Sequence, residues 1–178
     1  MRNVLTVQAI APGAGVPVWI RTGTGRDVGQ LSDHFEKLSY RARHNRFMGE
    51  AGNLTRIARE CLTSARKGEC FAFVAECRLD GRDVIVGEAS YAFDRMSGRG
   101  EFALSVADDF QRHGLGSTLL AALQSRAVSF GYLDLFGETL KSNDAMKNFA
   151  RKAGFEITPS LDWRAVRFDK MLCDRRSS

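Results

Sequence analysis

The most regular pattern of apolar and polar positions runs from Glu101 to Phe130. In its first part apolar residues alternate with small or polar ones, which is the period of a strand with two different faces. These alternating apolar residues are Phe102, Leu104 and Val106. Further along, apolar residues recur at helical spacing and form one stripe. The stripe consists of Leu115, Leu119, Ala122, Leu123, Ala127 and Phe130. The segment therefore predicts a strand, a tight turn with glycines and a long helix.

The rest of the chain predicts further strands and helices on both sides of this segment. Apolar alternation predicts strands over 16–22, 70–77, 84–93, 133–137, 155–157 and 163–171. Helical spacing and end signals predict helices over 27–38, 53–65 and 145–153. Asp80-Gly81 is a strong hairpin signal between two of the strands. This order favours an α/β (α+β) fold in which helices cover both faces of a mixed sheet.

Three segments have weaker patterns. Residues 1–15 are expected to form a leading strand or a loose arm, because polar residues interrupt their short apolar run. Residues 39–52 form a basic segment that we interpret as irregular, and residues 173–178 form a polar tail.

The composition is that of an ordinary folded protein. The 178 residues are 44% hydrophobic and 26% charged, which argues against disorder and suits a single domain over 1–178. The net charge of +5 suits an anionic ligand or an acidic partner, but the basic residues are too dispersed for a nucleic-acid site. No apolar stretch approaches the length of a membrane span, so no membrane partner is expected.

The cysteines and histidines show no ligand pattern. The chain contains Cys61, Cys70, Cys77, Cys173, His34, His44 and His113. They include no CxxC pair and no spacing typical of a metal site. We therefore expect reduced thiols, a cytoplasmic location, no metal and no disulfide.

The turn before the predicted long helix has the features of a phosphate-binding loop. Glycines allow the backbone to approach an anion, and a helix start offers unpaired N–H groups and the positive end of the helix dipole. No Lys follows Gly116, which excludes a P-loop, and the dinucleotide fingerprint GxGxxG does not fit either. Gln111, Gly114 and Gly116 instead match Q/R-x-x-G-x-G/A. The turn thus resembles the pyrophosphate loop of the GNAT (Gcn5-related N-acetyltransferase) superfamily.

A second block near the C-terminus strengthens this resemblance. Asn143, Met146, Gly154 and Phe155 lie at the spacing of a GNAT helix and the strand that follows it. The segments RARHNRFMGE, GEASY, EFALSV, FQRHGLG and NDAMKNFARKAGF look like the acetyltransferase domain of bacterial protein-lysine acetyltransferases. The resemblance covers the chain from Val16 on and implies a GNAT fold, with a mixed, mostly antiparallel sheet flanked by helices on both faces.

The resemblance also implies where acetyl-CoA would bind. Backbone N–H groups from Arg112 to Ser117 would hold the pyrophosphate, and the backbone of Leu104 and Val106 would pair with the pantetheine arm as an added strand. Asn143 would contact the cosubstrate, or it would simply cap its helix. The expected cofactor-binding residues are Leu104, Val106, Gln111, Arg112, His113, Gly114, Leu115, Gly116, Ser117 and Asn143.

Acetyl transfer to a lysine-like amine needs a base, because such an amine is mostly protonated at pH 7. Glu101 matches the position of the catalytic Glu in the protein-acetylating relatives, whereas we interpret Glu88 as a solvated strand residue. Many GNAT enzymes use a Tyr as general acid, and Ala150 occupies the corresponding position here. The basic residues from Arg41 to Arg46 would border the acceptor site or would simply face solvent.

The chain is therefore predicted to be an acetyl-CoA-dependent N-acetyltransferase, an acyltransferase that acts on a primary amine. Protein lysine is the favoured acceptor and a small-molecule amine is the alternative. The alternative outside the enzymes is a regulatory module that binds CoA without turnover. Monomer and homodimer both remain open.

Overall fold

A sheet of eight strands forms the centre of the fold. The computed structural model describes residues 7–10, 15–49, 51–63, 70–94, 96 and 99–172. Within them the strands lie in the order β1-β2-β3-β4-β5-β6-β8-β7. The strands are β1 (Val7–Ile10), β2 (Pro17–Thr22), β3 (Cys70–Leu79), β4 (Arg82–Asp94), β5 (Arg99–Val106), β6 (Asp134–Leu140), β7 (Glu156–Pro159) and β8 (Ala165–Met171). The helices are α1 (Val28–Lys37), α2 (Tyr40–Phe47), α3 (Leu54–Thr63), α4 (Leu115–Ser129) and α5 (Asp144–Lys152), with 3₁₀ turns η1 (Gly25–Asp27) and η2 (Asp108–Phe110).

Neighbouring strands are antiparallel except β5 and β6, which are parallel. β3 and β4 form the predicted hairpin. Asp80 and Gly81 have φ angles of 49° and 77°, as a two-residue turn of type I′ requires. The mixed, mostly antiparallel sheet confirms the fold expected from the sequence.

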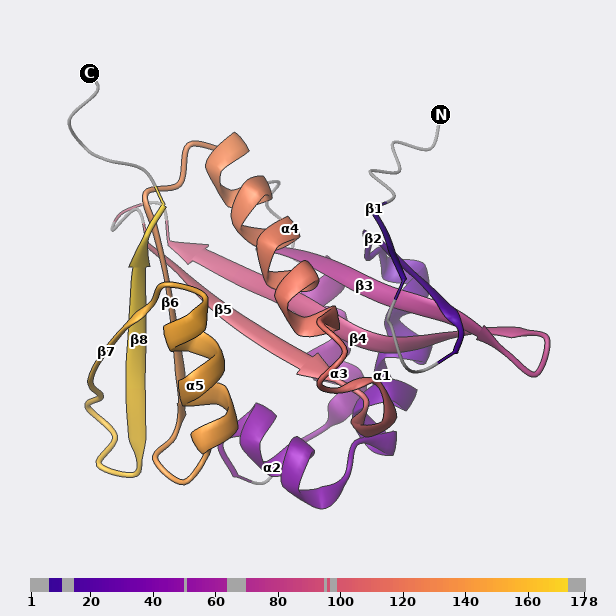
Figure 1. Ribbon diagram of the computed structural model, residues 1–178, viewed down its shortest axis with the longest axis horizontal. Coiled ribbons are helices and arrows are strands. Elements are labelled where there is room, and N and C mark those ends of the chain that lie inside the picture. The colour runs from indigo at the N-terminus through magenta and orange to yellow at the C-terminus, as the bar shows by residue number, and fades with distance from the viewer. Residues whose placement is uncertain are drawn as a thin grey trace.

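Helices cover both faces of this sheet (Figure 1). α4 packs on one face of β3, β4 and β5, where Leu119 and Leu123 are fully buried. α1 and α3 pack on the opposite face, around the buried side chains of Leu31, Phe35 and Val74. α2 lies beside β5 and β6. None of the helices in the described part of the chain is long and apolar enough to cross a bilayer.

The segment expected to be irregular contains helix α2, so this prediction is wrong. Periodicity missed the helix because polar residues fill most of its positions and no apolar stripe develops. Its ends define it instead. Ser39 Oγ accepts a hydrogen bond from the N–H of Ala42 at 3.2 Å, and Met48 adopts a left-handed conformation after the last turn. Three helices, rather than two, therefore connect β2 to β3.

The other predicted boundaries differ by only a few residues. The leading segment does contain a strand, because β1 pairs with β2. β6 runs on to Leu140, since residues 138–140 continue to pair with β8. β8 begins at Ala165, and Trp163 lies in the turn before it. The predicted last residues of the second helix and the polar tail lie outside the described residues.

Gly137 on β6 is a position where we expect even a methyl group to be destabilising. A Cβ there would lie 2.4 Å from Cε2 of Phe168 and 3.0 Å from Cε1 of Phe102, both buried rings. Gly137→Ala should therefore lower the free energy of unfolding by roughly 1–3 kcal/mol, measured by urea denaturation.

Gly29→Ala on α1 is the matched control, because a Cβ there would meet no atom within 4 Å. Better helix propensity should raise its stability by up to about 1 kcal/mol. A Gly137→Ala protein as stable as the wild type would contradict the close packing at β6.

Candidate active site

The site is organised around the divergence of β5 and β6. These two strands pair only from Arg99 with Asp134 to Glu101 with Phe136. Beyond that point β5 continues along β4 as far as Val106, while β6 continues along β8 as far as Leu140. Figure 1 shows the two strands separating there. The edge of β5 that faces β6 is therefore unpaired after Glu101.

The backbone groups of Leu104 and Val106 point to this unpaired edge. The N–H of Ala107 donates to the carbonyl of Val86 at 2.8 Å, and alternate residues of an antiparallel strand bond to the same neighbour. Ala103, Ser105 and Ala107 thus bond to β4, and the two residues between them, Leu104 and Val106, present their N–H and C=O groups to the gap. Gln111 Nε2 donates to the carbonyl of Val106 at 2.9 Å, which folds the following turn back over β5.

A cleft of about 750 Å³ opens at the divergence, with walls from α2, β5, β6, α5 and the start of α4. Most of the residues expected to bind the cofactor line it: Leu104, Val106, Gln111, Arg112, Gly114, Gly116, Ser117 and Asn143. His113 and Leu115 do not line it. The Leu115 side chain is only 2% exposed and belongs to the core, so only its backbone is available to a ligand.

The turn into α4 leaves several N–H groups without helical partners. Arg112 and Gly114 have φ angles of 64° and 83°, both in the left-handed region, which reverses the chain sharply before the helix. No side chain caps α4, and its first helical hydrogen bond runs from the N–H of Thr118 to the carbonyl of Gly114. The N–H groups of residues 115–117 precede that bond. Together with the helix dipole they form an anion-binding end at the cleft.

Asn143 has the structural role that the sequence left open. Its Oδ1 accepts from the N–H of Met146 at 3.2 Å and caps α5, while its Nδ2 donates to Thr139 Oγ1 at 2.9 Å. The residue lines the cleft but is only 8% exposed. Capping and packing thus account for its observed contacts.

Glu101 lies at the cleft, on the face of β5 that points away from α4. Its carboxylate makes no hydrogen bond or ion pair with the described residues. Although the side chain reaches solvent at the mouth, partial burial and then the nearby Glu138 carboxylate raise its pKa above the usual value. A raised pKa makes a carboxylate a better proton acceptor near neutral pH.

Glu88 is not the solvated residue that the sequence suggested. Its side chain is completely buried, and its Oε1 lies 2.8 Å from Nε of Arg46 on α2. Ser105 Oγ donates to the same oxygen at 3.1 Å. The interpretation was wrong because β4 is buried on both faces, so alternation along the sequence did not separate a solvent face. With its charge engaged inside the protein, Glu88 is a structural residue.

Arg46 also differs from the expectation of a basic surface. Its side chain is 10% exposed, and its guanidinium lies 5.6 Å from the ring centroid of Phe35 and 5.1 Å from that of Phe47. Arg46 and Arg41 both line the cleft, but only Arg41 is exposed. Of these two arginines, only Arg41 is therefore available to an acceptor at the cleft mouth.

A buried polar chain continues from this ion pair to α1. His34 Nε2 lies 2.9 Å from Ser105 Oγ, which in turn bonds to Glu88. Sequence reasoning missed this chain because its members come from four separate elements. The only local signals were a glutamate within an apolar strand and a histidine next to the apolar Phe35.

The cleft offers no tyrosine as a general acid among its described lining residues. Ala150, at the position where the family places this tyrosine, is fully buried and packs into the core. Within the described ranges no three His, Cys, Asp or Glu side chains form a metal-binding group. Cys61, Cys70 and Cys77 are free thiols, and Cys173 lies outside those ranges.

Comparisons with known proteins agree with this geometry. Residues 34–155 match the model of the Acetyltransferase (GNAT) family. The chain is 30% identical over 141 residues to Acetyltransferase PA5475 of Pseudomonas aeruginosa, a match that covers 79% of this chain and 76% of the relative. The GNAT domain of S. lividans PAT has a TM-score of 0.80 at 19% identity, over 93% of this chain and 96% of that one. An acetyltransferase of the GNAT family from Streptococcus pneumoniae has a TM-score of 0.65 at 16% identity, and the match covers 86% of this chain and 99% of that one.

The family match makes the chain an N-acyltransferase, whose mixed sheet divides beside an uncapped, glycine-containing helix start. The chain belongs to the GNAT acetyltransferase family.

His34 makes the stability of the fold sensitive to acid. Burial, and then the charge of Arg46, lower its pKa from 6.5 to about 4, although Asp108 acts in the opposite direction. Between these pH values the unfolded chain binds a proton that the folded chain does not, so the free energy of unfolding falls as the pH falls. By pH 4 the loss from this residue should approach about 3 kcal/mol.

Urea denaturation of the wild type and of His34→Gln at pH 7, 5 and 4 measures this loss. The glutamine amide can still bond to Ser105 but does not titrate in this range. We expect a smaller loss of stability in the variant over the same interval. Parallel pH dependences would show that His34 takes up its proton equally easily in the folded and unfolded states.

Proposed function

We propose that the protein transfers the acetyl group of acetyl-CoA to a primary amine, with the side chain of a protein lysine as the favoured acceptor. The observation that supports this function best is that one cleft combines an anion-binding helix end, an unpaired strand edge and an unpartnered carboxylate. The first two suit the pyrophosphate and pantetheine of the cosubstrate. The third, Glu101, suits the amine.

The residues present fit the cosubstrate. The turn at residues 112–117 supplies N–H groups to a pyrophosphate, and Gly116 keeps the helix start free of a side chain. The outward N–H and C=O of Leu104 and the outward N–H of Val106 offer strand-type hydrogen bonds to the amides of a pantetheine arm, while the Val106 carbonyl accepts from Gln111. We call the point where β5 and β6 separate the fork. An arm lying along β5 would point its thioester toward the fork, where Glu101 lies.

Glu101 would convert an ammonium group into a nucleophile. Its carboxylate takes one proton from R–NH₃⁺, and the neutral nitrogen then attacks the thioester carbonyl. The C–N bond forms, the C–S bond breaks and the sulfur leaves as a thiolate. The second proton lost by nitrogen neutralises the thiolate, and the proton held by Glu101 passes to solvent. A thiol has a pKa near 8.5, so the leaving group needs little help from a general acid, which is consistent with a cleft without tyrosine.

The wall of the cleft that α2 forms suits a macromolecular acceptor. Tyr40 on α2 is 75% exposed and stacks on His44, with ring centroids 5.8 Å apart. Arg41 lies beside Tyr40 and reaches the cleft mouth. An exposed aromatic residue and an arginine are typical contacts of a protein interface. The similarity to the GNAT domain of S. lividans PAT points in the same direction.

Release of free CoA in the presence of candidate amines tests the function. Transfer of labelled acetyl groups to lysine peptides supports protein lysine as the acceptor, and transfer only to spermidine would assign a small amine. Binding of acetyl-CoA without release by any amine would favour a CoA-binding module.

Gly116→Asp should abolish the binding of acetyl-CoA. A Cβ at this position lies 3.6 Å from both Leu104 and Phe149, which is ordinary contact, so the fold should tolerate the change. The added carboxylate would repel the pyrophosphate at the helix start. Acetyl-CoA in large excess should stabilise the wild type by roughly 2–4 kcal/mol, seen as a rise in Tm, but should leave Gly116→Asp unshifted.

Gly116→Ala is the control for packing and should still respond to acetyl-CoA. A wild type whose Tm does not change with acetyl-CoA would refute the proposed cosubstrate. An equal response from Gly116→Asp would move the pyrophosphate site away from this turn.

Glu101→Gln should lower turnover by roughly 10²–10⁴-fold at pH 7, because the amide keeps the size of the side chain but cannot take a proton. The affinity for acetyl-CoA should hardly change. The defect should shrink as the pH rises toward the pKa of the amine, because free amine then forms without a base. Initial rates of CoA release from pH 7 to 10 measure this trend, and near-wild-type turnover at pH 7 would exclude Glu101 as the base.

A further inference from the structure

A second carboxylate, Glu138, lies where β5 and β6 separate, on the strand opposite Glu101, and forms no ion pair with the described residues. Glu101 pairs with Phe136 across the two parallel strands, and Glu138 is two residues further along β6. Because side chains alternate along a strand, Glu138 lies on the same face as Phe136. Glu138 and Glu101 both line the cleft. The strands separate just beyond this level, so the two carboxylates flank the opening.

We infer that Glu138 binds the acceptor as an ammonium ion, so that Glu101 and Glu138 together select alkylamines that are protonated at neutral pH. This inference rests on the proposed function, and it assigns the substrate class of the same site. Glu138 would be a specificity and positioning residue that holds the cation, while Glu101 takes its proton.

The two arginines whose charges act on Glu101, Arg167 and Arg46, make their direct contacts with other groups. Arg167 lies directly across from Glu138 on β8, but its Nε bonds to both oxygens of Asp169 at 3.0 and 3.1 Å. Its guanidinium stacks 3.7 Å from the centroid of Phe136. Arg46, on the other side, is paired with Glu88. Within the described part of the chain, no cation forms an ion pair with Glu101 or Glu138.

The two carboxylates differ in how they are held. Ser160 Oγ donates to Oε1 of Glu138 at 3.0 Å, which fixes the orientation of this side chain. Glu101 has no such donor among the described residues. A fixed carboxylate suits the binding of a cation, whereas a free one at the cleft mouth can receive a proton and pass it to solvent.

The electrostatics favour a cation between these groups. Two like charges that share a partly desolvated cleft repel each other, and an ammonium group placed between them removes the repulsion and gains charge-assisted hydrogen bonds. A neutral amine would gain neither. An acceptor with a lysine-like side chain therefore fits the fork better than an arylamine, which is uncharged at pH 7.

Binding of peptides to the protein saturated with CoA tests the inference without turnover. The probes are a short peptide with one lysine and the same peptide with norleucine, which has no charge. Spermidine is a second cationic probe. Calorimetry should show that the wild type prefers the lysine peptide, and that Glu138→Gln reduces this preference by roughly 10–100-fold. Binding of the norleucine peptide should not change.

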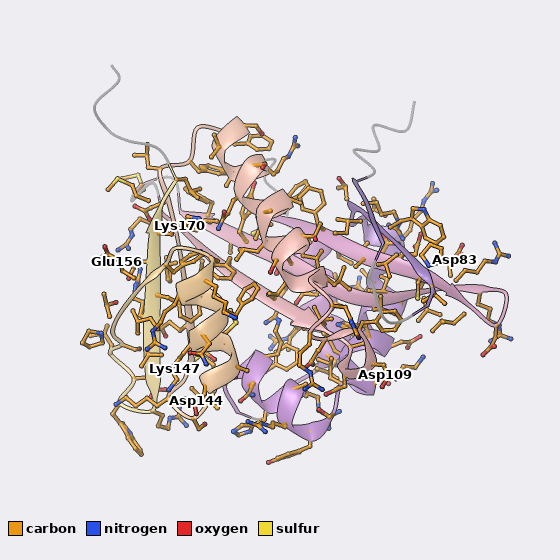
Figure 2. The ribbon with its side chains drawn as sticks, in the orientation of Figure 1. Asp83, Asp109, Asp144, Lys147, Glu156 and Lys170 are labelled. Carbon is orange, nitrogen blue, oxygen red and sulfur yellow. The ribbon has the colours of Figure 1, made fainter. Side chains whose placement is uncertain are left out.

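Two variants control for structural effects. Glu138→Asp keeps the charge and should retain part of the preference. Glu156→Gln removes a carboxylate from β7, which Figure 2 shows at the outer edge of the sheet, and should behave like the wild type. In steady state, Glu138→Gln should raise KM for the lysine peptide with little change in kcat, and its Tm should still rise with acetyl-CoA.

The outcomes separate this inference from the proposed function. A wild type that binds both peptides equally, or binds neither of them nor spermidine, would overturn the ammonium site. A Glu138→Gln protein with the wild-type preference, or with equal weakening for both peptides, would also overturn it. If the preference is lost as expected but no amine releases CoA, the cation site stands and the proposed catalysis fails.

Discussion

The separation of β5 from β6 is the constraint on which the rest of the molecule depends. Backbone N–H and C=O groups need partners, and a strand in the middle of a sheet normally finds them on both sides. β5 finds them on the β6 side only as far as Glu101. The remaining edge is held open because β6 is fully paired with β8 and β5 with β4. The fold thus leaves part of a strand edge without a neighbouring strand at the cleft, where a ligand can complete the hydrogen bonding.

The same opening gives the two faces of the sheet different electrostatic characters. On one face the uncapped start of α4 presents the positive end of a helix dipole to the cleft. On the other face the fork presents two carboxylates, Glu101 and Glu138, whose neighbouring arginines are paired elsewhere. An anionic cosubstrate and a cationic acceptor would therefore approach from opposite faces and meet at the unpaired edge of β5. Under the proposed function, this arrangement would keep the two substrates apart until they reach the position of transfer.

Helix α2 forms one wall of the cleft, and a buried ion pair helps to hold it in place. The Arg46–Glu88 pair joins α2 to β4, and Ser105 extends the same network to β5. Removing one partner of such a buried pair typically costs about 3–5 kcal/mol, because the other charge remains without compensation. At the start of the helix, Asp108 accepts from both the N–H and the hydroxyl of Ser39, which ties α2 to the segment before the glycine turn. The α2 wall of the cleft and the turn into α4 are thereby linked.

How far the sequence could predict this site depended on the range of the interactions. The strand, turn and helix from Glu101 to Phe130 were predictable because periodicity and glycine placement act locally, and the structure has β5 and α4 there. Helix α2 was not predicted, because the ion pair that stabilises it joins Arg46 to Glu88 on β4, and no local pattern encodes such a contact.

Glu88 and Glu101 show the same limit of local patterns. Both are glutamates in apolar strands, and their side chains lie on the same face of the sheet. Glu88 is opposite Ser105 and beneath Arg46, whereas Glu101 is at the last paired position before the fork. Only strand register and the position of α2 make one a buried structural charge and the other a carboxylate that lines the cleft.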